Sequence, residues 1–439
     1  METGQQPDSS VPNNLSVTIL ILNWNGRSLL QTCLPPLLHQ TYANYHVVVV
    51  DNGSTDDSVA FVQENFPQVQ LILNEENLGF SRGTNAGLRQ ISADVVVLLN
   101  NDVLVQPNWL AELIRPFHQD PHIGIVGCQL LYPDGTIQHL GAELTYPLAH
   151  SHHFHYKATA VPNLPAVQDV PYVTGAALAI RHTVQQAIGL LDETFHPFYY
   201  EEVDYCYRAK AAGFRVVLAA QATAVHNESA SLNKVPGLKL QTLHRNRYLF
   251  VLKHYTPAQF LQDFVPAEQK QLAEQYAFLN VDAIRLACLE VAIVAPHIVP
   301  QERTSAEITA VQNALLQLRE TAMKAQINQQ AAPPNLTEFA FPASATPFGA
   351  LVSKLRQAWS SIAAKWLVRH LQQQQAVQND YFQQQIERLT IQTESQAAEI
   401  EQLLAALLPT QHAFHQLAAD FSQRQQQLEQ HSSEQKSSS

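Results

Sequence analysis

The sequence contains few cysteines and no long apolar segment. Its four cysteines are scattered over 439 residues without a CxxC pair, which argues against a disulfide framework or a structural zinc site and favours a reducing compartment. No uncharged apolar run approaches the roughly 20 residues that a membrane-spanning helix needs, and residues 1–14 lack the apolar core of a signal peptide. We therefore expect a cytoplasmic protein, either soluble or peripheral on the inner face of the plasma membrane.

The sequence also has few positively charged residues. The chain has 26 lysines and arginines against 38 aspartates and glutamates, a net charge of −12, which argues against a nucleic-acid partner. A hydrophobic fraction of 46% is typical of a globular protein, and 439 residues are too many for one ordinary core. The composition thus predicts a folded protein of two or three units.

Strand-like runs alternate with helical stretches between residues 15 and 255. Val17–Leu22, Val47–Val50 and Val95–Leu99 are continuous β-branched or apolar runs, as in strands that are buried on both faces of a sheet. Because helical patterns separate them, we expect an α/β domain whose parallel strands are covered by helices on both faces. Ligands of such folds bind beyond the carboxyl ends of the strands, where the polar motifs described below fall.

The pattern becomes mainly helical after residue 255. Residues 256–330 are predicted to be a helical extension, and the proline-rich stretch 331–348 a linker. Residues 349–371, which include two tryptophans, are predicted to form an amphipathic basic helix. Two interpretations of this helix are open: it lies on an anionic membrane surface as a peripheral contact, or it packs against neighbouring helices.

The C-terminal tail is rich in glutamine. Apolar residues between 372 and 431 fall on the a and d positions of a heptad, interrupted near its middle. This spacing predicts a coiled coil that joins copies of the chain into a homo-oligomer or binds a partner. Residues 1–14 and 432–439 are polar and are expected to be disordered.

A polar motif, Val50–Asp56, follows the second predicted strand. The Asp51 carboxylate is able to accept hydrogen bonds from a base or a sugar hydroxyl. Gly53 permits a tight turn, and Ser54 or Thr55 is expected to cap the next helix. Taken alone, the motif is better explained by a capped turn between a strand and a helix than by a site.

The segment Asn74–Gly87 contains three glycines at four-residue spacing. They allow the backbone to approach a ligand closely, and Asn85 is expected at the start of a helix whose free N–H groups bind phosphate. Arg82 adds a positive charge. The alternative is a structural glycine loop.

Asp102 follows a strand, so its carboxylate is expected at the carboxyl edge of the sheet beside Asn100 and Asn101. Oxygen ligands suit hard cations such as Mg²⁺ or Mn²⁺, which neutralise a diphosphate leaving group. His226 closes a later strand and is a candidate for a further metal ligand or a diphosphate contact. The alternatives are an ordinary turn aspartate and a structural histidine.

Three carboxylates occupy four positions at Glu201, Glu202 and Asp204. If a helix begins near Glu201, they lie in its first turn, where the helix dipole favours negative charge. The functional interpretation is that Glu202 accepts a proton from a sugar hydroxyl while Glu201 or Asp204 orients its neighbours. Arg208 is four residues after Asp204 and is expected to pair with it.

Taken in chain order, these segments resemble glycosyltransferase family 2 enzymes of the GT-A fold, especially the rhamnosyltransferase-like branch. Each motif is weak alone, and the resemblance covers residues 15–255. The matching pieces are the strand and turn of residues 17–26, Val50–Asp56, Asn77–Phe80, Leu99–Asp102, Val173–Ala176, Glu201–Asp204, His226 and Arg245–Arg247.

The resemblance implies a GT-A-type mixed sheet flanked by helices. It also implies an inverting transfer of a sugar from a nucleotide-diphosphate donor, dTDP-rhamnose-like or a UDP-sugar, to a glycan or lipid-linked acceptor in cell-surface polysaccharide synthesis. By this likeness Asp102 and His226 hold Mg²⁺ or Mn²⁺, and Glu202 is the base with Glu201 and Asp204 beside it. The residues assigned to donor binding are Asn23, Asp51, Asn52, Ser54, Asn77, Gly79, Arg82, Asn85, Asn101, Gly175 and Ala176.

The chain departs from the family at two places. The family usually has Glu-Asp where this chain has Glu201 and Glu202, and small residues or asparagine in place of Arg82 and Thr84. A nucleotidyltransferase of the same fold is a second enzyme hypothesis, but its basic glycine-rich N-terminal loop is missing. A catalytically degenerate scaffold that acts through its coiled-coil tail is the third, and the intact acidic residues count against it.

Overall fold

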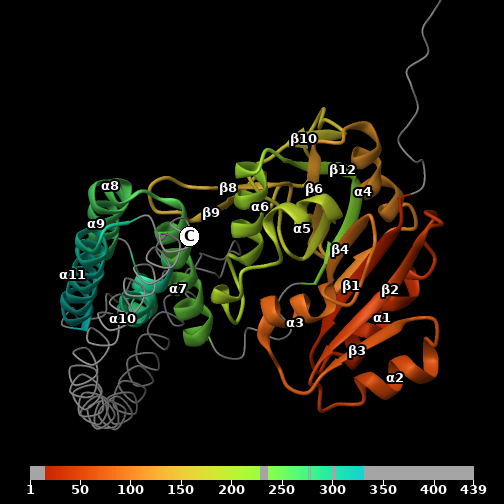
Figure 1. Ribbon diagram of the computed structural model, residues 1–439, viewed down its shortest axis with the longest axis horizontal. Coiled ribbons are helices and arrows are strands. Elements are labelled where there is room, and N and C mark those ends of the chain that lie inside the picture. The colour runs from red at the N-terminus through yellow and green to blue at the C-terminus, as the bar shows by residue number, and fades with distance from the viewer. Residues whose placement is uncertain (1–14, 228–235, 275, 277, 299–302, 331–439) are drawn as a thin grey trace, which may run out of the picture. The chain divides into compact units, whose positions relative to one another are not determined.

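The computed structural model describes residues 15–227, 236–274, 276, 278–298 and 303–330 (Figure 1). The chain ends, the linker, the basic helix and the coiled coil predicted from the sequence lie outside these residues and stay predictions. Among the described helices, none combines the length and the apolar character that crossing a bilayer requires.

Strands and helices alternate through the first two thirds of the described chain. The strands are β1 (Val17–Asn23), β2 (Tyr45–Asn52), β3 (Gln70–Asn74), β4 (Val95–Asn100), β5 (Val103–Val105), β6 (Ile123–Leu131), β7 (Ile137–His139), β8 (Ala142–Leu144), β9 (Ser151–His153), β10 (Val167–Asp169), β11 (Ala177–Arg181) and β12 (Arg215–His226). The helices are α1 (Arg27–Leu37), α2 (Ser58–Asn65), α3 (Gly79–Leu88), α4 (Trp109–Gln119), α5 (His182–Ile188), η1 (Glu193–Phe195), α6 (Glu201–Ala211), α7 (Pro236–His254), α8 (Pro257–Gln259), η3 (Phe260–Phe264), α9 (Val265–Glu274), α10 (Phe278–Ile298) and α11 (Ser305–Gln330).

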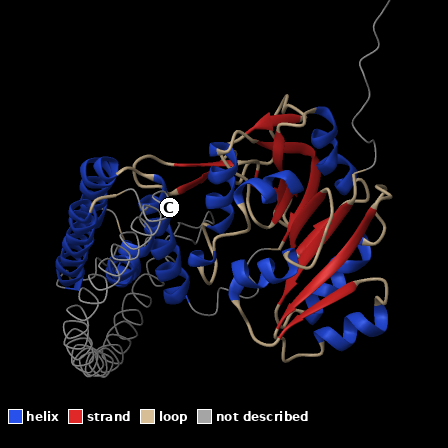
Figure 2. Ribbon diagram, in the orientation of Figure 1, coloured by secondary structure: helices blue, strands red, loops and turns tan. Residues whose placement is uncertain are grey.

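Ten strands form one mixed sheet, in which the order β10-β12-β6-β11-β4-β1-β2-β3 is extended by β5 beside β12 and β7 beside β6. Strands β4, β1, β2 and β3 run parallel, whereas β11 lies antiparallel between β4 and β6. Figure 2 shows helices on both sides of the strands. This mixed sheet, flanked by helices and followed by further helices, confirms the predicted fold class.

Successive side chains of the central strands lie in two separate apolar cores, because alternate residues of a strand point to opposite faces of the sheet. In β1, Ile19 and Ile21 belong to the core that the apolar sides of α1 and α4 complete. Leu20 belongs to the core on the other face, which contains side chains of α3, α5 and α6. Burial on both faces explains why β1, β2 and β4 are almost continuously apolar.

The helices after residue 236 share their core with the sheet. One apolar cluster extends from the face that carries Leu20 through α6 and α7 into α10 and α11. A buried ion pair joins α7 to α9, with Arg247 Nη1 donating to Glu268 Oε2 at 3.0 Å. Tyr248 donates to the other oxygen of the same carboxylate at 2.8 Å. The helical extension is thus held to α7 by both apolar packing and a buried charge pair.

We expect Glu268→Ala to lower the free energy of unfolding by about 3–5 kcal/mol, because it leaves the Arg247 charge buried without its counter-ion. Burial alone would raise the pKa of Glu268, but Arg247 and the hydrogen bonds from Arg247 and Tyr248 outweigh it, so this pKa is lowered. A carboxylate with a lowered folded-state pKa stabilises the protein above its unfolded pKa, and this contribution is lost as the pH falls through the folded value.

Urea unfolding at neutral and acidic pH tests this expectation. The difference between wild type and variant should be largest at neutral pH and should shrink in acid. Glu274→Ala is the matched control, since Glu274 is exposed on the same helix, and a surface change of this kind costs at most about 0.5 kcal/mol. Equal effects of the two substitutions would contradict a structural role for the pair.

Candidate active site

Polar side chains at the carboxyl ends of β1, β2 and β4 bind one another. Asn23 Nδ2 donates to Asp51 Oδ2 at 3.1 Å, and Asn23 Oδ1 accepts from Asn101 Nδ2 at 2.9 Å. The strand register accounts for this contact, because the parallel pairing of β1 with β2 places Asn23 beside Asp51. Asp51 Oδ1 also accepts from the backbone N–H of Ser54 at 2.9 Å. Four of the predicted donor-binding residues therefore form one preorganised group.

The turn after β1 depends on a glycine and an asparagine. A Cβ atom at Gly26 would lie 2.4 Å from Asn23 Oδ1 and 2.5 Å from Asn101 Nδ2, so only glycine leaves room for that contact. Asn25 has a positive φ of 49° and accepts through Oδ1 from the backbone N–H of Thr55 at 2.7 Å. Asn25 was not a predicted site residue, although its place directly after a strand is a usable signal.

The predicted capping role of Ser54 and Thr55 is wrong. Helix α2 begins at Ser58, and its N-cap residue, Asp57, makes no side-chain capping hydrogen bond. Ser54 Oγ instead accepts from the backbone N–H of Asn25 at 2.8 Å. The hydroxyl is used to close the β1 and β2 loops onto each other, a long-range contact that the local sequence does not reveal.

The amide of Asn52 organises the glycine-rich segment. Its Nδ2 donates to Asn77 Oδ1 at 2.9 Å and to the carbonyl of Gly79 at 3.1 Å. Its Oδ1 accepts from Asn74 Nδ2 at 3.0 Å and from the Leu78 N–H at 3.2 Å. Asn52 and Asn77 thus hold the start of α3 in place.

The predicted position of Asn85 at a helix start is also wrong. Helix α3 begins at Gly79, so Asn85 lies in its second turn and is buried. The Asn85 side chain donates to the carbonyl of Leu191 at 2.9 Å and accepts from the Leu191 N–H at 3.1 Å. Arg82 is half exposed and lies 3.7 Å from Glu193. Asn85 therefore ties α3 to a neighbouring loop rather than presenting an amide to phosphate.

Close packing explains why a glycine-rich segment is helical. A Cβ atom at Gly83 would lie 2.9 Å from the side-chain amide of Asn52, and one at Gly87 would lie 2.5 Å from Val50 Cγ2. Glycine disfavours helix in isolation, by roughly 1 kcal/mol relative to alanine. Here the helix lies so close to β2 that a side chain at these positions would not fit.

Asp102 and His226, the predicted metal ligands, come together at the junction of β5 and β12. The antiparallel pairing of these strands places His226 opposite Val103, and His226 Nε2 is 3.1 Å from Asp102 Oδ1. His226 Nδ1 is 2.7 Å from Gln138 Oε1. Because an amide oxygen only accepts, Nδ1 carries a ring proton, and Nε2 is the nitrogen that faces Asp102.

This arrangement fits a divalent cation. Asp102 Oδ1 is buried and has no hydrogen-bond partner among the described residues. A carboxylate oxygen and an imidazole nitrogen are both common metal ligands, and a cation bound by the two would give this oxygen a partner. Gln138, which sequence reasoning missed, fixes the orientation of the histidine ring because its Oε1 accepts a hydrogen bond from the Nδ1–H group. No group of three or more potential protein ligands occurs in the part of the chain that the structure describes.

Glu201 and Glu202 open helix α6, as predicted. Burial, together with the neighbouring Glu202 charge, raises the pKa of Glu201 well above its usual value. Burial also raises the pKa of Glu202, although a backbone hydrogen bond from Gly175 acts in the opposite direction. Within the described residues, each carboxyl group has one buried oxygen without a hydrogen-bond partner. Two such groups side by side are typical of a site that moves protons.

The segment from Thr174 to Ala176 connects this acidic pair to the sheet edge. A Cβ atom at Gly175 would lie 3.4 Å from Glu202 Cβ and 3.7 Å from Phe80 Cζ, so Glu202, Gly175 and Phe80 meet. The carbonyl of Ala176 accepts from the backbone N–H of Asn100 at 2.9 Å, directly before the residues that carry the metal pair. The acids and the strand ends therefore belong to one region.

His139 supports the same segment and was not predicted. It is buried, and its Nε2 accepts from the N–H of Thr174 at 3.3 Å. Burial and the nearby histidines hold the pKa of His139 well below its ordinary value, so the ring is neutral and able to accept. No sequence pattern distinguishes His139 from other histidines.

Comparison with known protein families identifies the family to which this chain belongs. The family described as "Glycosyltransferase like family 2" matches residues 12–242, more than half of the chain. The chain belongs to glycosyltransferase family 2.

The relatives of this glycosyltransferase include longer proteins. The O-antigen biosynthesis protein RfbC of Myxococcus xanthus is 31% identical over 224 residues, which are 49% of this chain and 17% of that protein. The uncharacterized protein y4gI of Sinorhizobium fredii is 31% identical over 232 residues, 49% of this chain and 25% of that protein. This chain thus spans a quarter or less of the length of both relatives.

A third relative is matched over most of its length. The N-acetylglucosaminyl-diphospho-decaprenol L-rhamnosyltransferase of Mycobacterium tuberculosis is 23% identical over 234 residues, 48% of this chain and 75% of that protein. Among solved structures, a mannosyltransferase from Pyrobaculum calidifontis in complex with GDP-Man and Mn²⁺ overlaps with a TM-score of 0.43 at 16% identity, covering 74% of this chain and 89% of that chain.

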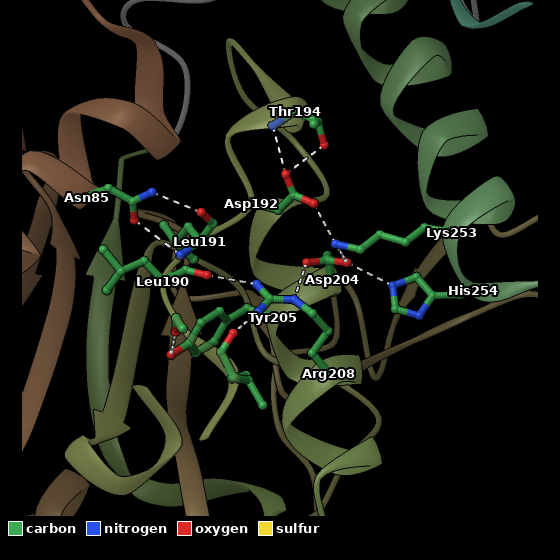
Figure 3. A network of polar contacts seen from close by, with 12 residues as sticks. Asn85, Leu190, Leu191, Asp192, Thr194, Asp204, Tyr205, Arg208, Lys253 and His254 are labelled. Atoms are coloured by element: carbon green, nitrogen blue, oxygen red, sulfur yellow. Dashed lines mark hydrogen bonds and ion pairs between the residues drawn. The ribbon is translucent and has the colours of Figure 1, made fainter. Parts of the chain in front are cut away.

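Asp204 of the glycosyltransferase is turned toward α7 (Figure 3). Its Oδ2 accepts from Arg208 Nε at 2.7 Å, the pairing predicted from the sequence, and its Oδ1 lies 2.7 Å from Lys253 Nζ and 2.8 Å from His254 Nε2. Burial alone would raise its pKa, but the hydrogen bond from His254 and the two cations lower the pKa of Asp204 to about 2.

This network corrects the prediction that Asp204 stands beside the base. Two residues correspond to about 200° around a helix, so Asp204 and Glu202 point to opposite sides of α6. Lys253 also reaches Asp192 Oδ2 at 2.6 Å, which ties the loop before η1 to α6 and α7 (Figure 3). Asp204 anchors the helix that carries the acidic pair.

Proposed function

We propose that this glycosyltransferase transfers a sugar from a nucleotide-diphosphate donor to an acceptor hydroxyl with inversion, and that Glu202 is the base. The observation that carries the proposal is the carboxyl group of Glu202, which lies against Gly175 beside a second carboxyl group, has one buried oxygen without a hydrogen-bond partner among the described residues, and has a raised pKa. A carboxylate whose pKa is raised is a stronger base than a free glutamate and is suited to accept a proton from a hydroxyl group.

The proposed step is a single displacement. The acceptor oxygen attacks the anomeric carbon as its proton passes to Glu202, and the bond from that carbon to the diphosphate oxygen breaks. Burial and the neighbouring Glu202 charge raise the pKa of Glu201 well above its usual value, and burial raises that of Glu202. We therefore assign the proton of the acidic pair to Glu201 and the negative charge to Glu202.

The donor is proposed to bind where β1, β2 and β4 end. The group formed by Asn23, Asp51 and Asn101 is buried or half-buried and is suited to a nucleotide base and ribose, which present several donors and acceptors. Asp102 and His226 would hold Mg²⁺ or Mn²⁺ between them. When bound, such an ion supplies positive charge that stabilises a diphosphate leaving group.

The class of substrate is proposed from the relatives. The name of the Mycobacterium tuberculosis relative specifies rhamnosyl transfer to a lipid-diphosphate-linked sugar, and that of the Myxococcus xanthus relative specifies O-antigen biosynthesis. We therefore propose a dTDP-rhamnose-like or UDP-sugar donor and a glycan or lipid-linked acceptor in cell-surface polysaccharide synthesis. The degenerate scaffold is the alternative, and the acids at 102, 201 and 202 speak against it.

A panel of UDP-, dTDP- and GDP-sugars with Mn²⁺ tests the proposal, with donor hydrolysis and transfer to simple glycoside acceptors as the readouts. NMR of the product is expected to show the anomeric configuration opposite to that of the donor. Retention would overturn the single displacement. Absence of both turnover and Mn²⁺-dependent nucleotide binding would favour the scaffold.

Gly175→Ala is expected to slow transfer by about 10-fold, equivalent to roughly 1.4 kcal/mol. The added Cβ would make only ordinary contacts, 3.4 Å to Glu202 and 3.7 Å to Phe80, so the fold should be retained while the space beside Glu202 shrinks. Binding of the free nucleotide should stay unchanged, because the base and ribose are proposed to lie against Asn23, Asp51 and Asn101, whereas Gly175, also assigned to donor binding, lies against Glu202. Transfer rates, calorimetric nucleotide binding and thermal unfolding measure these effects.

The control for this variant is Gly135→Ala, in the turn between β6 and β7. Gly135 has a φ of +82°, and a Cβ atom at this position would meet only open space, so alanine is strained there without touching the site. This variant should lower stability, by roughly 1 kcal/mol, and leave transfer intact. The opposite pattern in the two variants would contradict the placement of Gly175.

A further inference from the structure

The turn that precedes the acidic helix has an uncommon backbone conformation. Tyr199 and Tyr200 have φ angles of 77° and 72°, in the left-handed region that non-glycine residues rarely adopt. Such residues persist only where their surroundings hold them. Because Glu201 and Glu202 follow directly, this turn sets the direction in which both carboxyl groups point.

A single buried side chain of α7 binds the backbone of that turn. Asn246 is fully buried, and its Nδ2 lies within hydrogen-bonding distance of three carbonyl oxygens, those of Phe195 at 3.0 Å, Phe198 at 2.9 Å and Tyr199 at 2.9 Å. Arg245 donates to Asn246 Oδ1 at 2.7 Å, which fixes the amide so that its nitrogen faces the turn.

Arg245 also binds the backbone of the same loop. Its Nη1 lies 3.1 Å from the carbonyl oxygen of Thr194 and 3.2 Å from that of His196. The motif Arg245–Arg247, noted in the sequence but given no role there, therefore holds residues 194–199 through the side chains of its first two members. Its third member, Arg247, binds the carbonyl of Leu148 at 2.8 Å as well as Glu268.

The loop that Asn246 holds also contacts the opposite wall of the site. The carbonyl of Pro197 accepts from the N–H of Phe80 at 2.8 Å, and a Cβ atom at Gly79 would lie 2.6 Å from His196 Nδ1. Phe80 in turn lies beside Gly175, which contacts Glu202. The loop thus joins the start of α3 to the start of α6.

We propose that Asn246 is a positioning residue, which keeps Glu202 directed at the acceptor by holding the left-handed turn at Tyr199 and Tyr200. The proposal rests on the proposed function of Glu202 as the base. Lys253 and His254, on the same helix, bind Asp204 one turn further along α6, and Lys253 also binds Asp192 before η1. Substitutions at these residues can therefore separate the contribution of Asn246 from that of the other α7 side chains.

Asn246→Ala tests the proposal in the full-length protein. We expect kcat to fall about 30-fold, within the range for displaced catalytic groups, while donor KM and Mn²⁺-dependent nucleotide binding change less than about twofold. Release of the turn exposes Glu202 to water, so its pKa falls and the acidic limb of the pH–rate profile moves to lower pH. A purely structural role would reduce the amount of folded enzyme and leave this profile in place.

Lys253→Met is the matched control, because it removes two ion pairs from the same helix without touching the turn. It should lower stability and leave the kcat and pH profile of the folded enzyme unchanged. If Asn246→Ala does not fold, the double variant Asn246→Ala with Tyr199→Gly replaces it in the same measurements. Glycine adopts the left-handed conformation without strain.

Two results would overturn the proposal: a kcat within threefold of wild type for folded Asn246→Ala, or an unmoved acidic limb. Glu202→Gln distinguishes this failure from failure of the proposed function. If Glu202→Gln is inactive while Asn246→Ala is active, only the positioning role falls. If Glu202→Gln is active, the assignment of the base falls first.

Discussion

Asp102→Asn is expected to abolish stabilisation of the protein by Mn²⁺ and to slow transfer by about 10³-fold, since a metal ion contributes several kcal/mol at a charged leaving group. The substitution preserves the shape of the side chain but removes its charge. A ligand that binds only the folded state raises Tm as its concentration rises. The Mn²⁺-dependent rise in Tm should therefore disappear in the variant.

The metal-free protein gives a second readout for the same variant. Asp102 Oδ1 is buried without a hydrogen-bond partner among the described residues, which costs free energy. Without Mn²⁺ the asparagine variant should thus be as stable as wild type or more stable. Asp134→Asn, at an exposed turn, is the control and should keep the full response to Mn²⁺. An undiminished Mn²⁺ response in Asp102→Asn would contradict the metal site.

A change at the residue that orients His226 should have an intermediate effect. Gln138→Leu removes the acceptor for His226 Nδ1, so both tautomers of the ring become available. Mn²⁺ affinity is expected to fall by about 10–100-fold, the range for residues that hydrogen-bond to metal ligands. Calorimetry with Mn²⁺ and a nucleoside diphosphate measures this loss. A metal held by Asp102 alone would not respond to the change at Gln138.

The sheet edge was predictable because it follows from local patterns that many residues share. Continuous apolar runs mark β1, β2 and β4, and polar residues directly after them must lie at one edge of the sheet. The same logic placed Asp102 and His226 near each other although 124 positions separate them, since both stand at strand ends. The pairing of β5 with β12 then brings them into contact.

The same reasoning from local patterns failed for α3, because its glycines suggest a loop. Local propensity predicts a loop for Asn77–Gly83, and the structure has a helix from Gly79 because Asn52 and Val50 leave no room for side chains. The displaced helix start moved Asn85 from a phosphate-binding position to the interior. Propensity is a weak prior where tertiary contacts choose the backbone.

Side chains that bind distant backbone were not predictable at all. Asn246 donates to carbonyls that stand 47 to 51 positions earlier, and His139 accepts from an N–H that stands 35 positions later. A carbonyl or an N–H has no signature of its own in a sequence. The motif containing Asn246 was visible, but its partners became known only with the fold.

For the acidic pair, Glu201 and Glu202, one part of the structure was predictable from the sequence and another part was not. The first turn of α6 was predicted from the cluster of acids, yet which acid faces the site depends on burial and on α7. Asp204 is neutralised by Arg208, Lys253 and His254, whereas Glu201 and Glu202 have no cation among the ion pairs of the described residues. The acids that lack a cationic partner are the ones whose pKa is raised.

Glu202→Gln is expected to lower kcat by about 10³-fold, the middle of the range for loss of a general base. Glutamine keeps the size and the contact with Gly175 but does not accept the proton. In wild type the base must be ionised, so the rate rises with pH through the raised pKa of Glu202. This acidic limb should vanish in the variant, while nucleotide binding in the presence of Mn²⁺ stays intact.

Stability should move in the opposite direction to activity. A carboxyl group whose folded-state pKa is raised loses stabilisation as the pH rises above its unfolded pKa, because the ionised form is disfavoured in the fold. Near neutral pH Glu202→Gln removes that cost, so its Tm should exceed that of wild type. Glu201→Gln replaces the group to which we assign the proton of the pair, and it should keep activity within about 10-fold, as expected for a neighbour of the base. If instead Glu201→Gln loses activity and Glu202→Gln keeps it, the base is Glu201 and the direction of α6 must be reassigned.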